Sequence, residues 1–374
     1  MKYLKLFEDY IEPELTNPNT EFIPNPKTQE SLLKELAKKE TNLELLRSLL
    51  QEDTVNITKE FTNQIPPLNI VAHYNERNSI ETTELLIHFG ADVNDSDEKE
   101  NTPLHLASNK GNAELCEYLI NQGVDIYKEN KLGKTPFELA FNDDVRKVLL
   151  NNMTCDKVKK LFISVCLHVD FNPELIKTIY KMSDCINLDD KVTEEEDYTM
   201  LQVLIYKHKN NAAEFLIRLG ADVNRKNKWG ETPLMTACYR ENVKIADDII
   251  SRMVSSENIK GINAKDKIGY SPLYIACMKN NIELVKLLLK PYLKANVNTI
   301  ATSTKETPLH VAVNNDNIEI TKLLLQKGAN VNLIPTGGLT VTEMVKSKEM
   351  TELLKEYGAY NSNSKIPVYS RKPF

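Results

Sequence analysis

The stretch Thr102-Pro103-Leu104-His105-Leu106-Ala107 recurs almost unchanged as Thr307-Pro308-Leu309-His310-Val311-Ala312. Looser copies of it start at Pro66, Thr135, Thr199, Thr232, Ser271 and Thr340. The eight starts lie 36, 33, 64, 33, 39, 36 and 33 residues apart along the chain. A motif that returns at such a period is the signature of a repeat architecture. Because 64 is close to twice 33, the spacing predicts one more, degenerate repeat between residues 155 and 198.

A second motif keeps the same phase, since Gly90-Ala91-Asp92-Val93-Asn94 returns at residues 220–224 and, with Asn in place of Asp, at 328–332. Threonine is a favourable helix N-cap because its hydroxyl accepts a hydrogen bond from a free N–H of the first turn. Proline at the next position needs no N–H, and glycine adopts the left-handed backbone that ends a helix. Each repeat is therefore predicted to contain a helix after Thr-Pro, a second apolar helix, and a turn.

These motifs resemble those of the ankyrin repeat family, and the resemblance covers about residues 65–360 and, more weakly, 30–64. It implies an all-α solenoid of about nine to ten units including caps, each unit a β-turn followed by two antiparallel helices. In that family the turns and first helices line a concave side. The family's histidine at the fourth motif position, here His105 and His310, bonds neighbouring backbone or hydroxyl groups.

The order of strong and weak repeats predicts how the chain is organised. We favour a continuous array, and the alternative is two sub-arrays, at about 29–152 and 155–360, that meet at an angle. The expected parts are a flexible N-terminal tail (1–28), N-terminal capping helices (29–64), ankyrin repeats (65–153), a degenerate repeat or joint (154–198), ankyrin repeats (199–339), a C-terminal cap (340–360) and a tail (361–374).

Composition indicates a cytoplasmic protein with no membrane span. The formal net charge of −6 argues against broad nucleic-acid binding, which usually needs a basic excess. No apolar run approaches the length that spans a membrane, and acids interrupt the N-terminal stretch where a signal peptide is apolar. The six cysteines form no Cys-x-x-Cys pair, so we expect reduced, buried thiols. We also expect a monomer.

Catalytic motifs are missing from the sequence. Gly133-Lys134-Thr135 resembles the end of a phosphate-binding loop, but position 128, where that loop needs glycine, is lysine. The six histidines match no metal-binding spacing, and the chain has no Gly-x-Ser-x-Gly. Cys166 and His168 lie two positions apart on a predicted helix, so their side chains diverge. We therefore predict no catalytic residue, no metal site and no cofactor.

In a solenoid the scaffold positions repeat while the binding positions vary. Seven residues after the motif starts, the C-terminal half carries an apolar row of Tyr206, Tyr239 and Met278. The next residues form a basic row of Lys207, Arg240 and Lys279. Three residues before the starts, Trp229 and Ile268 lie at adjacent turn tips, with Arg225, Lys226, Lys228, Lys265 and Lys267 nearby. Trp, Tyr and Arg often anchor interfaces, so we predict that these eight positions bind a partner segment carrying hydrophobic and acidic side chains.

The predicted function is a non-catalytic protein–protein interaction scaffold or adaptor. Related proteins occur among host-directed proteins of viruses and intracellular bacteria, and the Asn-, Lys- and Ile-rich composition suits such an origin, including action in the host cytoplasm. One alternative is an enzyme, or its targeting arm, with chemistry in the degenerate or N-terminal region. Another is recognition of nucleic acid or an anionic surface by the basic row, which would weaken steeply with salt.

Overall fold

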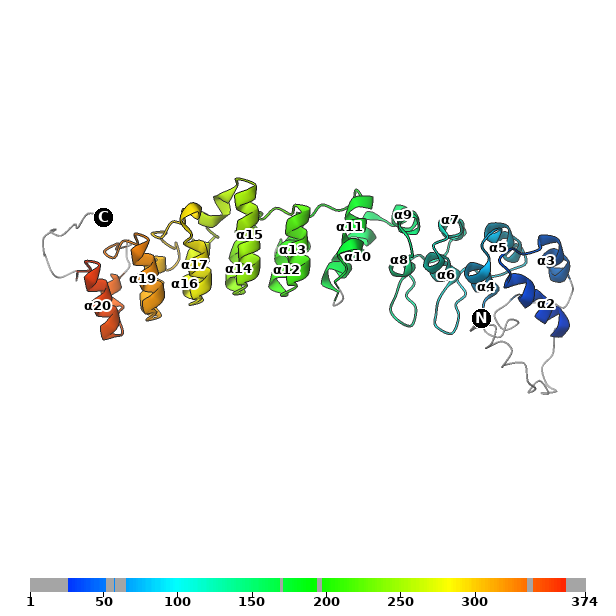
Figure 1. The fold of residues 1–374 in the computed structure, drawn as a ribbon, viewed down its shortest axis with the longest axis horizontal. Coiled ribbons are helices and arrows are strands. Elements are labelled where there is room, and N and C mark those ends of the chain that lie inside the picture. The colour runs from blue at the N-terminus through cyan, green and yellow to red at the C-terminus, as the bar shows by residue number, and fades with distance from the viewer. Residues whose placement is uncertain are drawn as a thin grey trace. The chain divides into compact units, whose positions relative to one another are not determined.

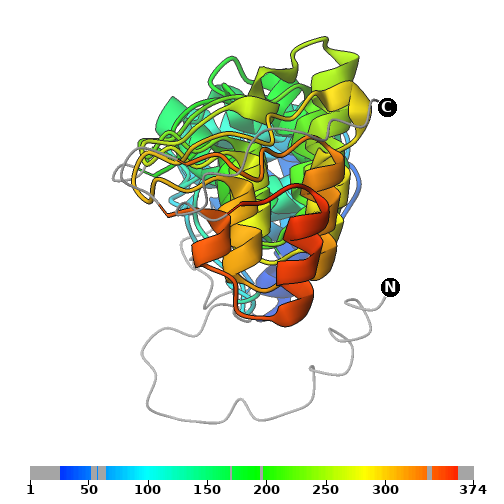
Figure 2. The same ribbon diagram turned by 90° about the vertical axis from the view of Figure 1, so that its left-hand side faces the viewer.

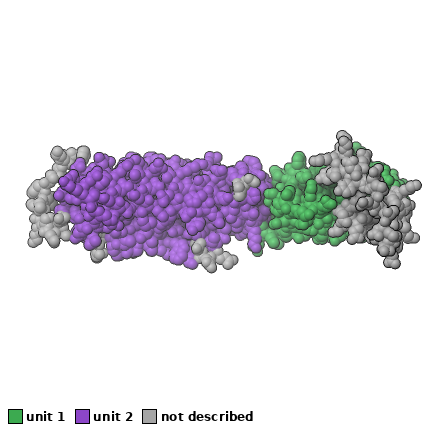
Figure 3. Space-filling view, turned by 90° about the horizontal axis from the view of Figure 1, so that it is seen from below, with its two compact units in different colours: residues 1–157 green, residues 158–374 purple. Residues whose placement is uncertain are grey.

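The computed structural model describes residues 26–51, 57, 65–168, 171–193, 197–334 and 339–360, and the following statements concern these residues. Residues 1–25 of the expected N-terminal tail (1–28) and the expected tail at 361–374 lie outside them, and a helix already begins at Pro26. The described residues form α-helices and short 3-10 helices and no strand, which confirms the all-α prediction. None of these helices is long and apolar enough to cross a membrane. The chain divides into two compact units, residues 1–157 and 158–374 (Figure 3).

Unit 1 is a stack of helix pairs (Figure 1). First helices pack on first helices, as α4 on α6 and α6 on α8, and second helices pack on second helices, as α5 on α7 and α7 on α9. The helices are α2 (Pro26–Leu36), α3 (Leu43–Leu50), α4 (Pro67–Tyr74), α5 (Ser79–His88), α6 (Pro103–Lys110), α7 (Ala113–Asn121), α8 (Pro136–Leu139) and α9 (Asp143–Asn151). Helix α10 (Cys155–Leu167) begins here and continues into the second unit.

Unit 2 repeats the same arrangement, with α12, α14, α16 and α18 forming one layer and α13, α15, α17 and α19 the other. Its elements are α11 (Pro173–Met182), α12 (Met200–Tyr206), α13 (Asn210–Leu219), α14 (Pro233–Tyr239), α15 (Val243–Ser255), η1 (Ile259–Asn263), α16 (Pro272–Met278), α17 (Ile282–Leu288), η2 (Pro291–Leu293), α18 (Pro308–Asn314), α19 (Ile318–Gln326), η3 (Val341–Glu343) and α20 (Lys348–Glu356). In Figure 2 the loops that join successive pairs, coloured green to orange, project to the same side of these helices.

Local sequence explains where the helices begin and end. Thr232 and Thr307 are N-caps whose hydroxyls accept from the backbone N–H three residues later, and a proline follows each of them. Second helices begin after an asparagine that plays the same part, as Asn242 does for α15. Gly220 ends α13 in the left-handed conformation, as the Gly-Ala-Asp motif predicts.

The junction between the two helices of a pair also needs left-handed backbone. In α6–α7 this position is Gly111, whose φ is 78°. The four equivalent positions in unit 2 have φ angles of 54° to 56°, although none of them is glycine: His208, Glu241, Asn280 and Asp316. A side chain is strained in this region, so the tight junction is maintained at a cost in stability.

The motif histidines tie each helix pair to the next. Nδ1 of His105 accepts from the backbone N–H of Thr102 at 3.1 Å, and Nε2 donates to the carbonyl of Lys134 at 3.1 Å. His310 makes the same two bonds, to Thr307 at 3.3 Å and to the carbonyl of Leu339 at 3.0 Å. Both imidazoles are buried. The predicted structural role of these histidines is confirmed.

Other residues at the fourth motif position show which groups can replace the histidine in these two hydrogen bonds. Gln202 accepts from the N–H of Thr199 and donates to the carbonyl of Glu231 at 2.9 Å, so an amide replaces the imidazole. Asn69 donates to the carbonyl of Asn101, but its buried Oδ1 has no hydrogen-bond partner. The motif start there is Pro66, which has no N–H to donate.

The cysteines agree with the sequence prediction only in part. Four thiols are free and buried: Cys116, Cys166, Cys238 and Cys277. Burial raises the pKa of Cys238 to about 12, so this thiol stays protonated and packs as a small apolar group. The expectation of reduced thiols is wrong for Cys155 and Cys185, which are disulfide-bonded. The absence of a Cys-x-x-Cys motif does not exclude a disulfide, because folding can bring cysteines that are far apart in sequence within bonding distance.

Candidate partner-binding surface

The first-helix ends of unit 2 bring the predicted apolar row together. Helices α12, α14 and α16 are packed neighbours, and their last residues are Tyr206, Tyr239 and Met278. The side chain of Tyr206 is 52% exposed and that of Met278 is 36% exposed. Lys207 and Lys279, which follow them as C-caps, are exposed too. We call this side of unit 2, made of helix ends and adjoining turns, the first-helix face.

The two predicted turn-tip residues also lie on adjacent repeats. Trp229 is 50% exposed and Ile268 is 45% exposed. The backbone N–H of Lys267 donates to the carbonyl of Trp229 at 2.9 Å, and that of Thr302 donates to the carbonyl of Ile268 at 3.0 Å. A backbone hydrogen bond at each step therefore holds the tips in register, so both apolar side chains are presented on an ordered framework.

Tyr239, predicted as a member of the apolar row, also makes a polar contact. Its ring is only partly exposed, and its hydroxyl donates to Oδ2 of Asp266 at 3.3 Å. Burial raises the pKa of the Tyr239 hydroxyl, and the negative charges of Asp266 and Glu231 raise it further. Tyr239 thus links α14 to the turn of the next repeat and adds a negative environment to a surface that we expected to be basic.

Arg240 is likewise held by its neighbours. Its guanidinium lies over the ring of Tyr206, 4.7 Å from the centroid, and Nη2 bonds with Nε2 of His208 at 2.9 Å. Tyr206 in turn stacks on Tyr198, with 6.4 Å between ring centroids. The result is a layered cation–π arrangement. Arg240, a member of the predicted basic row, is therefore a fixed part of the surface.

Lysines near the tips have structural contacts as well. Nζ of Lys226 donates to the carbonyl of Lys265 at 2.9 Å, and Nζ of Lys265 donates to the carbonyl of Ile300 at 3.1 Å. The ammonium of Lys228 lies 5.3 Å from the centroid of the Trp229 ring. The two bonds made by Nζ of Lys226 and Lys265 cross from one turn to the next, so part of the predicted group of basic residues at the turn tips serves to join the repeats.

Sequence reasoning missed three residues that share this face: Asp266, Tyr270 and Glu306. Tyr270 and Glu306 each stand one position before a motif start, and Asp266 stands five positions before one. All three are partly exposed. For Tyr270 and Glu306 the signal was available in principle, because residues next to a repeat's constant Thr or Ser vary from repeat to repeat, whereas the position of Asp266 is Asp or Asn in several repeats.

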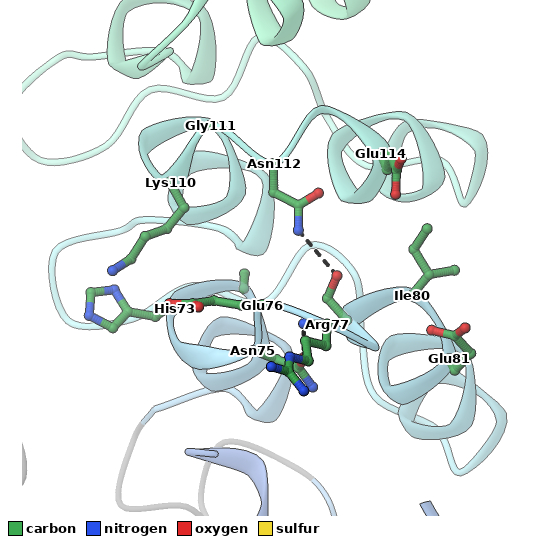
Figure 4. A pocket seen from close by; sticks show the side chains of 12 residues that line it. His73, Asn75, Glu76, Arg77, Ile80, Glu81, Lys110, Gly111, Asn112 and Glu114 are labelled. Carbon is green, nitrogen blue, oxygen red and sulfur yellow. Dashed lines mark hydrogen bonds between the residues drawn. The ribbon is translucent and has the colours of Figure 1, made fainter. Parts of the chain in front are cut away.

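Unit 1 contains a polar cavity of about 430 Å³ between the α4–α5 and α6–α7 junctions (Figure 4). The side-chain amide of Asn112 donates to the hydroxyl of Ser79 at 3.1 Å across it. Lys110 extends toward His73, where burial, and then the charge of Lys110, lowers the pKa of the imidazole. The lining is mostly polar and charged, unlike that of the apolar pockets that bind small molecules.

The arrangement does not favour catalysis at the residues we considered. Cys166 is buried, and burial raises its pKa to about 12, which leaves it a thiol where a nucleophile must be a thiolate. The Figure 4 cavity lies at residues 72–114, outside both the degenerate segment 154–198 and the N-terminal region 1–64 in which the enzyme alternative placed its chemistry. Within the described ranges no three His, Cys, Asp or Glu side chains gather so as to hold a metal ion.

Comparison with protein families agrees with this geometry. A family model described as ankyrin repeats (3 copies) matches residues 33–130, 68–160 and 247–334, which together make up more than half of the chain. A second, described as ankyrin repeats (many copies), matches residues 201–250. No curated protein matches the chain significantly. Ankyrin repeats are protein–protein interaction modules, and the chain, with its stacked helix pairs and projecting turns, belongs to the ankyrin-repeat family.

Proposed function

We propose that this protein is a scaffold or adaptor that holds a segment of a partner protein on the first-helix face of unit 2. Binding there needs no catalytic group, and specificity comes from side chains that differ between repeats. The residues that make the contact are Tyr206, Lys207, Trp229, Tyr239, Arg240, Ile268, Met278 and Lys279. Action on a host cell stays a prediction from composition and family.

One observation carries the proposal: large apolar side chains are exposed at two kinds of repeat position in unit 2, the first-helix ends and the turn tips. Tyr206, Trp229, Ile268 and Met278 leave between 36% and 52% of their surface in contact with water. An apolar strip bordered by charge is typical of an interaction site, and aromatic residues most often supply its binding energy. Lys207 and Lys279 at the border favour acidic groups on the partner.

The test is capture of partners from a cell lysate by wild type and by two single variants. Trp229→Ala and Tyr206→Ala each remove an exposed aromatic side chain from the face. Tyr292→Ala is the matched control, because Tyr292 is 54% exposed but lies in η2, after the second helix of its repeat. Circular dichroism checks that all four proteins are folded.

We expect a partner that the wild type and Tyr292→Ala retain equally and that the two face variants lose. Loss of a central aromatic anchor costs about 2 kcal/mol or more of binding free energy, which is roughly a thirtyfold weaker Kd. Equal retention by all four proteins would refute the proposed face. Loss with the control variant as well would show that the surface is not confined to the first-helix side.

A further inference from the structure

Beside the basic row, the first-helix face carries a negatively charged, tyrosine-lined strip. We define the acidic tyrosine strip as Glu231, Tyr239, Asp266, Tyr270 and Glu306, all of them partly exposed. These residues come from three consecutive repeats. The strip therefore runs along the stack, as the basic row of helix ends does.

The carboxylates of Asp266 and Glu306 each accept hydrogen bonds from neighbouring groups. Oδ1 of Asp266 accepts from the backbone N–H of Ile268 at 3.0 Å and of Tyr270 at 2.8 Å, and Oε2 of Glu306 accepts from the hydroxyl of Tyr274 at 3.0 Å. These donors are neutral. Beyond residue 200 the described ion pairs use the carboxylates of Glu214, Asp247, Glu319 and Glu352, and none uses Asp266 or Glu306.

The environment of the tyrosines agrees with a negative potential. Burial raises the pKa of the Tyr239 hydroxyl most, and the charged groups that raise it further, Asp266 and Glu231, are both acids. At Tyr274, burial again acts first and the charge of Glu306 adds to it. At both hydroxyls the main charged neighbours are therefore carboxylates, chiefly those of Asp266 and Glu306.

The strip also offers aromatic surface. Tyr270 is partly exposed and stacks on buried Tyr274, with 4.4 Å between ring centroids and 27° between ring planes. Tyr270 is linked to Asp266 through its backbone N–H, and the tyrosine on which it stacks, Tyr274, bonds Glu306, so the stack holds the ring of Tyr270 near both acids. A tyrosine ring attracts a cation to its face, and nearby carboxylates strengthen that attraction.

We propose that the acidic tyrosine strip receives a lysine or arginine side chain of the bound partner. This inference rests on the proposed function. It adds a basic side chain to the hydrophobic and acidic side chains expected of the partner segment. Acidic groups of the segment face Lys207 and Lys279, its apolar groups cover Trp229 and Met278, and its cation enters the strip. Opposite charges on its two edges would fix the direction in which it lies.

The chain itself supplies the variants that remove the charge and keep the fold. Asn227 occupies the position equivalent to Asp266 one repeat earlier, and its Oδ1 accepts from Trp229 N–H and Glu231 N–H in the same way. Asp266→Asn should therefore preserve the turn. Glu306→Gln keeps an oxygen that can accept from Tyr274. The double variant Asp266→Asn/Glu306→Gln loses two negative charges.

The probe is a phage-displayed library of random 16-residue peptides, selected on the full wild-type chain. Peptides whose capture is lost with Trp229→Ala define binders of the face, and these are synthesised and measured by fluorescence anisotropy. We expect them to contain a lysine or arginine, and the double variant to bind them at least tenfold more weakly. Replacing that arginine by citrulline, or that lysine by norleucine, should weaken wild-type binding equally and abolish the difference between the proteins.

The results separate the two proposals. Trp229-dependent peptides that bind wild type and the double variant equally would overturn the cation strip and leave the proposed function standing. Weakening that persists after the peptide's cation is replaced would also overturn the strip, because the effect would then be structural. Selection that returns no Trp229-dependent peptide would overturn both.

Discussion

The buried histidine of the α18 motif provides a direct test of how the repeats are joined. His310 is 1% exposed, and it bonds the N–H and hydroxyl of Thr307 and the carbonyl of Leu339. His310→Ala leaves the Thr307 N–H and the Leu339 carbonyl without these partners. The N–H of Thr307 is buried, and leaving such a group unsatisfied costs about 1–3 kcal/mol. Loss of the buried imidazole also leaves a cavity, so the variant should destabilise the region by about 2–4 kcal/mol.

His310→Gln is the matched variant, because Gln202 already makes both bonds at the equivalent position. We expect His310→Gln to lower the free energy of unfolding of this region by less than about 1 kcal/mol, as a modest change in packing does. Since repeat arrays do not always unfold as a single unit, the assay should be local. Hydrogen-exchange mass spectrometry of peptides from α18 and α19 reports the free energy of opening there.

The expected result is a loss of protection of about thirtyfold or more in His310→Ala, since 1.4 kcal/mol corresponds to a factor of ten. In His310→Gln the protection should stay within about fivefold of wild type. Peptides from unit 1 provide the internal reference. The reasoning is refuted if the two variants lose protection equally, or if the alanine variant loses none.

Three further predictions follow from the backbone and from burial. Glu241→Gly should stabilise unit 2 by about 1 kcal/mol in urea unfolding, because Glu241 holds a φ of 54° that glycine adopts without strain; a lower midpoint would contradict this. Gly269→Ala should destabilise by more than about 2 kcal/mol in the same assay, because φ is 88° and a Cβ would lie 2.3 Å from the backbone nitrogen of Thr302; wild-type stability would count against it. Burial lowers the pKa of His310 below its ordinary value of 6.5, so the unfolded chain binds more protons and stability should fall as pH drops below 6.5. His310→Gln should show a smaller fall between pH 7 and 5, and an unchanged pH profile would exclude the histidine as its cause.

Several features of this protein were predictable from the sequence because they depend on neighbours within one repeat. A threonine N-cap, a proline at the first helical position and a glycine after the second helix act over a few residues, so their recurrence located the helix starts at Pro103, Pro233 and Pro308. The exposed positions of Tyr206 and Met278 followed from the same periodicity.

The sequence did not indicate the left-handed junctions at residues such as Glu241. None of the unit 2 junctions has a glycine to mark it, because the packing of the helix pair dictates the backbone there. It also did not reveal that Tyr239 bonds with Asp266, or that Arg240 lies over Tyr206. These partners are 27 and 34 residues apart. Which of them meet depends on the register with which one repeat stacks on the next. That register is decided by the summed packing of the helix layers, so it cannot be deduced from any short segment of the sequence alone.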